Sequence, residues 1–173
     1  MSARQHYDSV LAIHPVSAGI VFTFFMGPLA PHDWGIKETR GKNKNALALE
    51  AAVALIERLQ PDMLVLEDCS GSISRRSHRN RRLQQLIANC ATGQAIDVHW
   101  FSRADIRKCF AAVGAVTRME IARAIASQVH AFSHRVPPAR KFWDTQNPRL
   151  CLFDAASLAM TFYSRTRTDP PEA

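Results

Sequence analysis

The feature that most constrains the fold is a short apolar run that ends in two acidic residues. It is the run M-L-V-L at positions 63–66, which continues into Glu67 and Asp68. A run of this length is typical of a strand buried on both faces, and such strands lie in sheets that helices cover on both sides. In an open α/β sheet, the functional crevice lies just outside the carboxyl ends of the strands. Glu67 is therefore predicted where a carboxylate can hold a metal ion or a proton, and the alternative is that it only caps a loop.

The segments around this run show strand and helix patterns in a defined order. Three strands separated by short turns come first and predict an antiparallel meander, at residues 9–13, 20–25 and 33–38. Another strand pattern follows the central run, and apolar residues recur with helical spacing over residues 47–59, 79–92 and 152–163 and after the N-caps Ser102 and Thr117. This order resembles that of the ribonuclease H-like fold. We therefore expect an α/β fold with a mixed central sheet, in which strands 1–3 are antiparallel and the others parallel, flanked by helices.

Length and composition set broad limits on the protein. The 173 residues suffice for one domain with a sizeable core, which we place at about residues 9–163, and the polar tail 164–173 is expected to be flexible. No run of about 18 apolar residues occurs, so no membrane span is expected. The first residues lack the pattern of a secretion signal, and the four cysteines form no C-x-x-C pair. These features favour a reducing compartment, and we expect a cytoplasmic protein.

The excess of basic residues indicates a polyanionic partner. The net charge is +7, and nucleic acid is the partner that such a charge favours. Five arginines follow the central strand near the start of the next helix, where forked guanidinium donors and helix amides can grip phosphates: Arg75, Arg76, Arg79, Arg81 and Arg82. The alternative is a solvated helix face, although a face without interleaved acids would repel itself. Arg140 and Lys141 form a further basic loop.

Four segments resemble the motifs of one nuclease family. Residues 10–15 are similar to its first strand, L-G-I-D-P-G, and residues 60–67 are similar to its Q-P-D-x-x-x-x-E strand. Residues 102–118 resemble its basic helix, V-G turn and following helix, and residues 154–161 resemble its terminal D-A-x-A-x-A helix. In their order and spacing these motifs, which together span residues 10–162, resemble the RuvC-like Holliday junction resolvases.

The resemblance implies two-metal hydrolysis of phosphodiester bonds, in which clustered carboxylates hold Mg²⁺ or Mn²⁺. It makes Glu67 and Asp154 metal ligands and catalytic residues. Two positions depart from the family pattern: His14 stands where an aspartate is expected, and Cys151 stands one helical turn before Asp154 in place of a second aspartate. His14 is expected either to bind a metal softer than Mg²⁺ or to be a hydrogen-bonded residue of a decayed site. Cys151 is expected to be part of the helix core.

Other side chains are candidates to complete this site. Asp144, in a predicted loop, is the candidate for the missing catalytic carboxylate, and Asp68 is a spare one. The resemblance also implies that three basic residues line the substrate face: Arg107, Lys108 and Arg118.

Two functions of different classes follow. The first is a homodimeric, metal-dependent endonuclease that acts selectively on branched DNA. The second is a RuvC-like protein with an impaired or inactive site, which binds branched DNA or structured RNA without cutting it. Because His14→Asp restores the family residue, we expect this change to raise Mg²⁺-dependent junction cleavage at least about tenfold.

Overall fold

The computed structural model describes residues 6–71, 75–138 and 149–168, and within these ranges the chain forms a mixed sheet of five strands. The strand order is β3-β2-β1-β4-β5, with bounds Val10–Val16 for β1, Gly19–Phe25 for β2, Pro31–Glu38 for β3, Met63–Glu67 for β4 and Asp97–Phe101 for β5. Strands β1 to β3 form the predicted antiparallel meander, and β4 pairs in parallel with both β1 and β5. The predicted mixed sheet is therefore confirmed, with β4 next to β1 near its centre.

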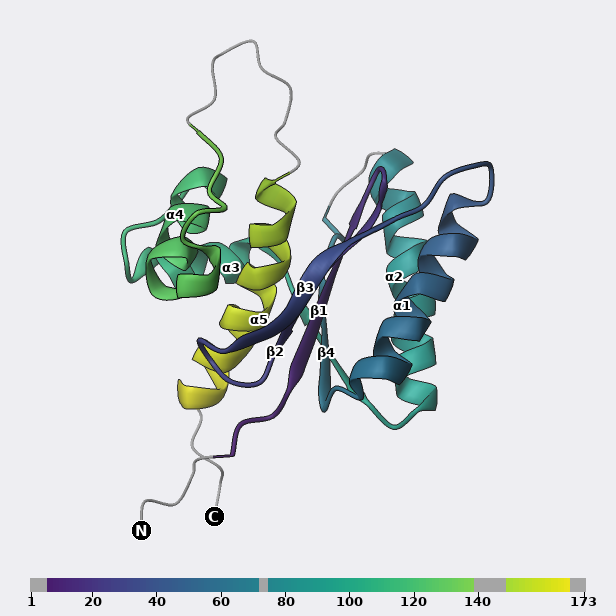
Figure 1. Cartoon of the computed structure of the whole chain (residues 1–173), viewed down its shortest axis with the longest axis horizontal. Coiled ribbons are helices and arrows are strands. Elements are labelled where there is room, and N and C mark those ends of the chain that lie inside the picture. Colours follow the sequence, from purple (N-terminus) through teal and green to yellow (C-terminus); the bar gives the residue numbers. More distant parts are fainter. Residues whose placement is uncertain (1–5, 72–74, 139–148, 169–173) are drawn as a thin grey trace.

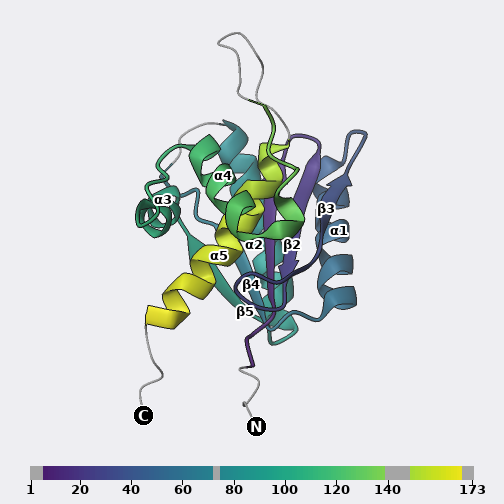
Figure 2. The ribbon, with the colours of Figure 1, turned by 60° about the vertical axis from the view of Figure 1, so that its left-hand side comes forward.

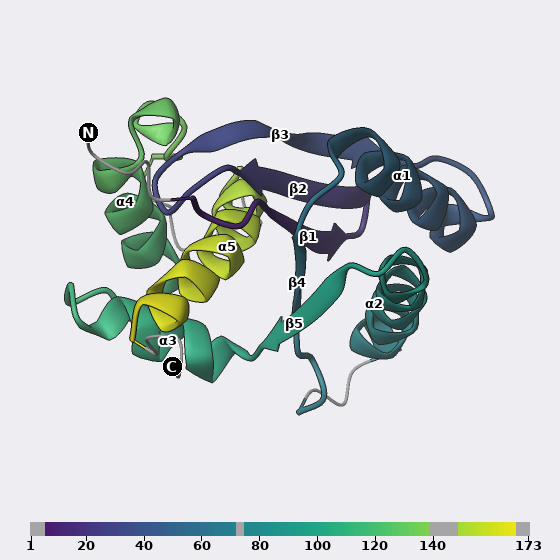
Figure 3. The same ribbon diagram turned by 90° about the horizontal axis from the view of Figure 1, so that it is seen from below.

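Helices cover both faces of this sheet (Figures 1 and 3). On one face lie α1 (Lys44–Leu59) and α2 (Arg75–Gly93); on the other lie α3 (Arg103–Ala111), α4 (Arg118–Gln128) and α5 (Leu150–Thr168), with a short 3₁₀ turn at His130–Phe132. Figure 2 shows α5 crossing the sheet with α3 and α4 beside it. None of the helices within the described ranges has the length and apolarity needed to cross a lipid bilayer.

The alternation of side chains along β1 divides the core into two layers. Leu11 and Ile13 pack in the layer of α1 and α2, whereas Val10 and Ala12 pack in the layer of α3, α4 and α5. Because side chains alternate between the two faces of a strand, the next residue on the side of Ala12 is His14. The pattern of the strand therefore directs this polar residue toward α5.

Several element boundaries differ from the sequence prediction; α5, for example, spans Leu150–Thr168 and continues into the tail 164–173 that was expected to be flexible. Helix α2 begins at Arg75, four residues before the predicted start at Arg79. Its first turn is polar, so no apolar repeat marks it. Strand β1 continues through His14 and Pro15 to Val16, and β2 begins at Gly19. Gly19 has φ +145°, and a Cβ at this position would collide with the carbonyl oxygen of Lys37, so the hairpin requires glycine here.

Candidate functional site

Three predicted site residues converge at the carboxyl end of β4. Ile13 and Leu66 are register partners in the parallel pair β1 and β4, so the residues that follow them, His14 and Glu67, lie side by side. The imidazole Nδ1 of His14 lies 3.3 Å from Oε2 of Glu67, and its Nε2 lies 3.6 Å from Oδ2 of Asp154 on α5. These are ion-pair distances, and Nδ1 makes no well-aligned hydrogen bond. The ring of His14 therefore stands between the two carboxylates.

Two arginines reach the same carboxylates from the N-terminal ends of α3 and α4. Arg103 is the first residue of α3 and Arg118 is the first residue of α4. Both helices begin with a complete capping box, in which the Ser102 or Thr117 side chain accepts a bond from the third helical residue and that residue's carboxylate bonds back. Because these caps fix where each helix begins, they also fix where the two guanidinium groups enter the site.

The arginines and His14 together engage every oxygen of the two carboxylates. Arg103 places Nε 2.6 Å from Oε1 of Glu67 and Nη1 3.2 Å from Oδ1 of Asp154. Nε of Arg118 donates to Oδ1 and Oδ2 of Asp154 at 3.0 and 3.1 Å, and its Nη2 also contacts Oδ2. The remaining oxygen, Oε2 of Glu67, faces His14. Each of the four carboxylate oxygens thus lies within 3.3 Å of a nitrogen of Arg103, Arg118 or His14.

Burial makes this pairing energetically important. Glu67 is 6% exposed and Asp154 is 4% exposed. Burial raises the pKa of the Glu67 carboxyl, but the contact with His14 and the charge of Arg103 outweigh it, so this pKa lies below its ordinary value. Burial likewise raises the pKa of Asp154. The hydrogen bonds from Arg118 and the charges of His14 and Arg103 lower this pKa by more, so it also lies below its ordinary value. Both groups are therefore carboxylates at neutral pH, with their counter-charges supplied by the protein.

This donor set does not fit the two-metal cluster that the family resemblance implies. Hard divalent ions need several free oxygen ligands, whereas the oxygens of Glu67 and Asp154 face guanidinium and imidazole nitrogens. Cys151, which stands in place of a second aspartate, is half-buried, and its Sγ accepts a bond from Nη2 of Arg118 at 3.6 Å. Within the described part of the chain, no group of three His, Cys, Asp or Glu residues has a geometry that could hold a metal ion.

The carboxylates line a cavity of about 420 Å³ at this edge of the sheet. Besides the ion-paired residues, its lining includes Asn80 from α2 and Arg107 from α3. Burial raises the pKa of the Cys69 thiol, which also lines this cavity. The charges of Arg103 and Arg81 offset part of this rise, so Arg81 lies close to the cavity. The N-terminal part of α2, where the predicted basic cluster lies, therefore borders this cavity through Asn80.

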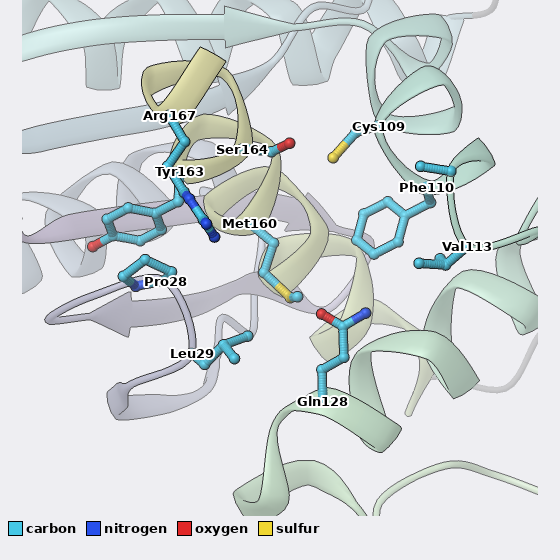
Figure 4. Close-up of a pocket in the computed structure, with 11 residues that line it drawn as sticks. Pro28, Leu29, Cys109, Phe110, Val113, Gln128, Met160, Tyr163, Ser164 and Arg167 are labelled. Carbon is cyan, nitrogen blue, oxygen red and sulfur yellow. The ribbon is translucent and has the colours of Figure 1, made fainter. Parts of the chain in front are cut away.

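A second cavity of about 420 Å³ has a different chemistry. Phe110 and Met160 point into it from α3 and α5, and Leu29 borders it on the loop between β2 and β3 (Figure 4). Its lining among the described residues includes no Asp or Glu, and its polar groups are at Gln128, Ser164 and Arg167 together with the Tyr163 hydroxyl and the Cys109 thiol. The hydroxyl of Tyr163 already donates to backbone carbonyl oxygens. Of these two cavities, therefore, the first is the one that carboxylates line.

The structure places the other predicted residues as follows. The spare carboxylate Asp68 accepts a bond from the backbone N–H of Ser70 at 2.9 Å, so it stabilises its own loop. Exposed basic side chains occur at Arg79, Arg82, Arg107 and Lys108, and Arg81 is half-buried. Arg118 is also half-buried and belongs to the carboxylate site. Arg75 and Arg76 form the start of α2, and their side chains lie outside the described part, as do Asp144, Arg140 and Lys141.

Arg103 is the functional residue that the sequence reasoning missed. It follows the N-cap Ser102, which itself follows β5 directly, and the carboxyl end of β5 lies beside that of β4. The position of Arg103 at the first turn after a parallel strand is the signal that could have identified it.

Comparison with known structures decides the fold. No family model and no curated protein matches the sequence. The structure of RuvC from T. thermophilus in complex with a Holliday junction substrate matches with a TM-score of 0.68 and 13% identity, over 94% of this chain and 96% of that one. A further structure of Thermus thermophilus RuvC matches with a TM-score of 0.67 and 14% identity, over 92% of this chain and 96% of that one. This chain has the RuvC fold. The resemblance drawn from the sequence motifs is confirmed for the fold, and the RuvC-like topology explains why His14, Glu67 and Asp154 converge.

Proposed function

We propose that the protein binds branched DNA at the edge of the sheet where Glu67 and Asp154 line the cavity, and that it does not cut this DNA by a two-metal reaction. The observation that carries the second part is the pairing of all four oxygens of Glu67 and Asp154 with nitrogens of Arg103, Arg118 and His14. Carboxylates in such ion pairs are poor ligands for hard divalent ions, because an ion must first displace the guanidinium groups.

Charge and fold support a nucleic-acid partner. The net charge of +7 attracts polyanions. Exposed basic side chains lie near the cavity on α2 and α3, at Arg79, Arg82, Arg107 and Lys108. A RuvC that shares the fold over nearly its whole length has been solved with a Holliday junction substrate. On these grounds we propose branched DNA as the ligand of this chain. Structured RNA is the alternative ligand, and the same assay tests it.

Endonuclease activity on branched DNA is the second candidate function. It is favoured by the meeting of Glu67 and Asp154 at the carboxyl end of β4, where the resemblance to resolvases requires catalytic carboxylates. Activity would require Mg²⁺ or Mn²⁺ to replace the arginines at these oxygens.

We further propose that the protein acts as a homodimer in the cytoplasm. A four-way junction is approximately two-fold symmetric, and two copies of the site match that symmetry. The four cysteines are free thiols, which supports a reducing compartment.

The test compares binding and cleavage in the same samples. Fluorescence anisotropy should show tighter binding to a synthetic four-way junction than to linear duplex DNA of equal length, in EDTA as well as in Mg²⁺ or Mn²⁺. Gel analysis should show no cleavage with either ion. Equal affinity for both DNA forms would refute junction recognition, and tighter binding of a structured RNA would reassign the ligand. Cleavage that Glu67→Gln abolishes would establish the endonuclease instead.

A further inference from the structure

We infer that Arg103 and Arg118 are built-in replacements for divalent cations, which hold Glu67 and Asp154 together and keep metal ions out of the site. The inference deepens the proposed function, on which it rests, because it identifies the residues that make binding independent of metal. It concerns side chains of this chain alone and needs no bound ligand.

The charges of the site balance without a metal ion. Glu67 and Asp154 contribute two negative charges, and Arg103 and Arg118 contribute two positive charges, so the charges of these four groups sum to zero. Two carboxylates this deeply buried would otherwise repel one another. This repulsion acts on Glu67, because the charge of Asp154 raises its pKa while His14 and Arg103 lower it. The arginines therefore supply the compensation that a metal ion would give.

The geometry opposes the addition of a divalent ion. An ion bound to these oxygens would stand within a few ångströms of two guanidinium groups, and like charges at that separation repel strongly where water is scarce. Guanidinium retains its charge at any accessible pH, so neither arginine can yield by losing a proton. Burial lowers the pKa of each guanidinium, but the neighbouring carboxylates raise it by more. For Arg103 these carboxylates are Glu67 and Asp154, and for Arg118 the carboxylate is Asp154.

The two arginines are positioned by backbone structure. Each is the first residue of a helix that starts at a complete capping box, at Ser102 for α3 and Thr117 for α4. The partial positive charge of both helix N-termini adds to the attraction for the carboxylates. Arg103 also bridges the two acids, since it contacts Glu67 at 2.6 Å and Asp154 at 3.2 Å, as a bridging cation would.

This assignment changes the expected result of His14→Asp. A third carboxylate alone would face the same two guanidinium groups, which occupy the oxygens that an ion needs. We therefore expect His14→Asp to restore little metal binding by itself. Restoration should require the additional removal of Arg103 and Arg118.

The experiment measures Mn²⁺ binding by isothermal titration calorimetry, without DNA and without an activity readout. The test variant is Arg103→Met with Arg118→Met. The matched control is Lys42→Met with Lys44→Met, which removes the same number of charges from exposed positions at the start of α1 that do not line the cavity. We expect the test variant to bind Mn²⁺ at least about tenfold more tightly than the wild type, and the control to match the wild type. Equal Mn²⁺ affinity of the test variant and the wild type would overturn the inference.

A second comparison covers the case in which the test variant fails to fold. Titration of Mn²⁺ into the wild type and into Glu67→Gln should give the same isotherm, because Glu67 is not a metal ligand while Arg103 holds it. Loss of Mn²⁺ binding in Glu67→Gln would contradict the inference. These results are separable from the proposed function: a wild type that fails to prefer the junction refutes DNA recognition and leaves the Mn²⁺ comparison valid.

Discussion

Replacing Arg118 with methionine should destabilise the protein in a pH-dependent manner. Arg118 donates to both oxygens of Asp154, whose side chain is only 3% exposed. Methionine fills much of the space of the arginine stem but has no donor. Among the described residues, the side chain of Asp154 then keeps the ion-pair contacts with Arg103 at 3.2 Å and with His14 at 3.6 Å.

The magnitude follows from the burial of the two partners. Removing one partner of a fully buried ion pair costs about 3–5 kcal/mol. The cost here is reduced because the Arg118 side chain is 25% exposed and Arg103 remains near the carboxylate. We expect the free energy of unfolding to fall by about 2–3 kcal/mol at neutral pH, or Tm by about 4–12 °C for a chain of this size.

The pH dependence has a definite sign. In the wild type the lowered pKa of Asp154 gives stability that is present above the unfolded-state pKa of about 3.9 and is lost as the pH falls through the folded-state pKa. In Arg118→Met the pKa of Asp154 should rise, since less remains to offset burial. The destabilisation should therefore be largest at neutral pH and shrink as the pH falls through the Asp154 pKa of the variant toward the lower pKa of the wild type.

Urea unfolding followed by circular dichroism at neutral and acidic pH measures this difference. Arg107→Met is the matched control, because Arg107 lines the same cavity but is exposed and, among the described residues, pairs with neither carboxylate. The control should change the free energy of unfolding by less than about 0.5 kcal/mol. Equal effects of the two substitutions at neutral pH, or a larger effect of Arg118→Met at acidic pH, would refute the reasoning.

Two further predictions concern DNA binding and the helix cap. Replacing Arg79 and Arg82 together with alanine should weaken junction binding and reduce the slope of log affinity against log salt by about two, as measured by anisotropy over a salt series; an unchanged slope would place the DNA elsewhere. Thr117→Ala removes the cap of α4 and should lower the free energy of unfolding by about 1 kcal/mol, whereas Thr117→Ser, which retains the hydroxyl, should remain within a few tenths of a kcal/mol of the wild type in urea unfolding.

Local sequence patterns were sufficient for the sheet and for the position of Glu67. The apolar run before Glu67 and the alternation along the first strand depend on neighbouring residues, and both strands formed as expected. The N-caps Ser102 and Thr117 were also visible, because a capping box is a local pattern of four residues. The strand patterns placed Glu67 and His14 at one edge of the sheet, whereas Asp154 was identified through its resemblance to the terminal helix of the resolvases.

The role of the arginines could not be predicted in the same way. Arg103 is 51 residues from Asp154 in the chain, and Arg118 is 36 residues from it, so their pairing depends on how α3, α4 and α5 pack. Hydrophobic periodicity records which face of a helix is buried but not which polar residue meets which at its end. For the same reason the start of α2 at Arg75 was missed, since its first turn contains no apolar residue.

Crystals of the wild type grown with Mn²⁺ would show whether the arginines exclude a metal ion, because anomalous scattering identifies the ion without an activity measurement. We expect no Mn²⁺ peak between Glu67 and Asp154, with the guanidinium groups of Arg103 and Arg118 bound to the carboxylate oxygens. A Mn²⁺ peak coordinated by both carboxylates, with the arginines displaced, would contradict this expectation.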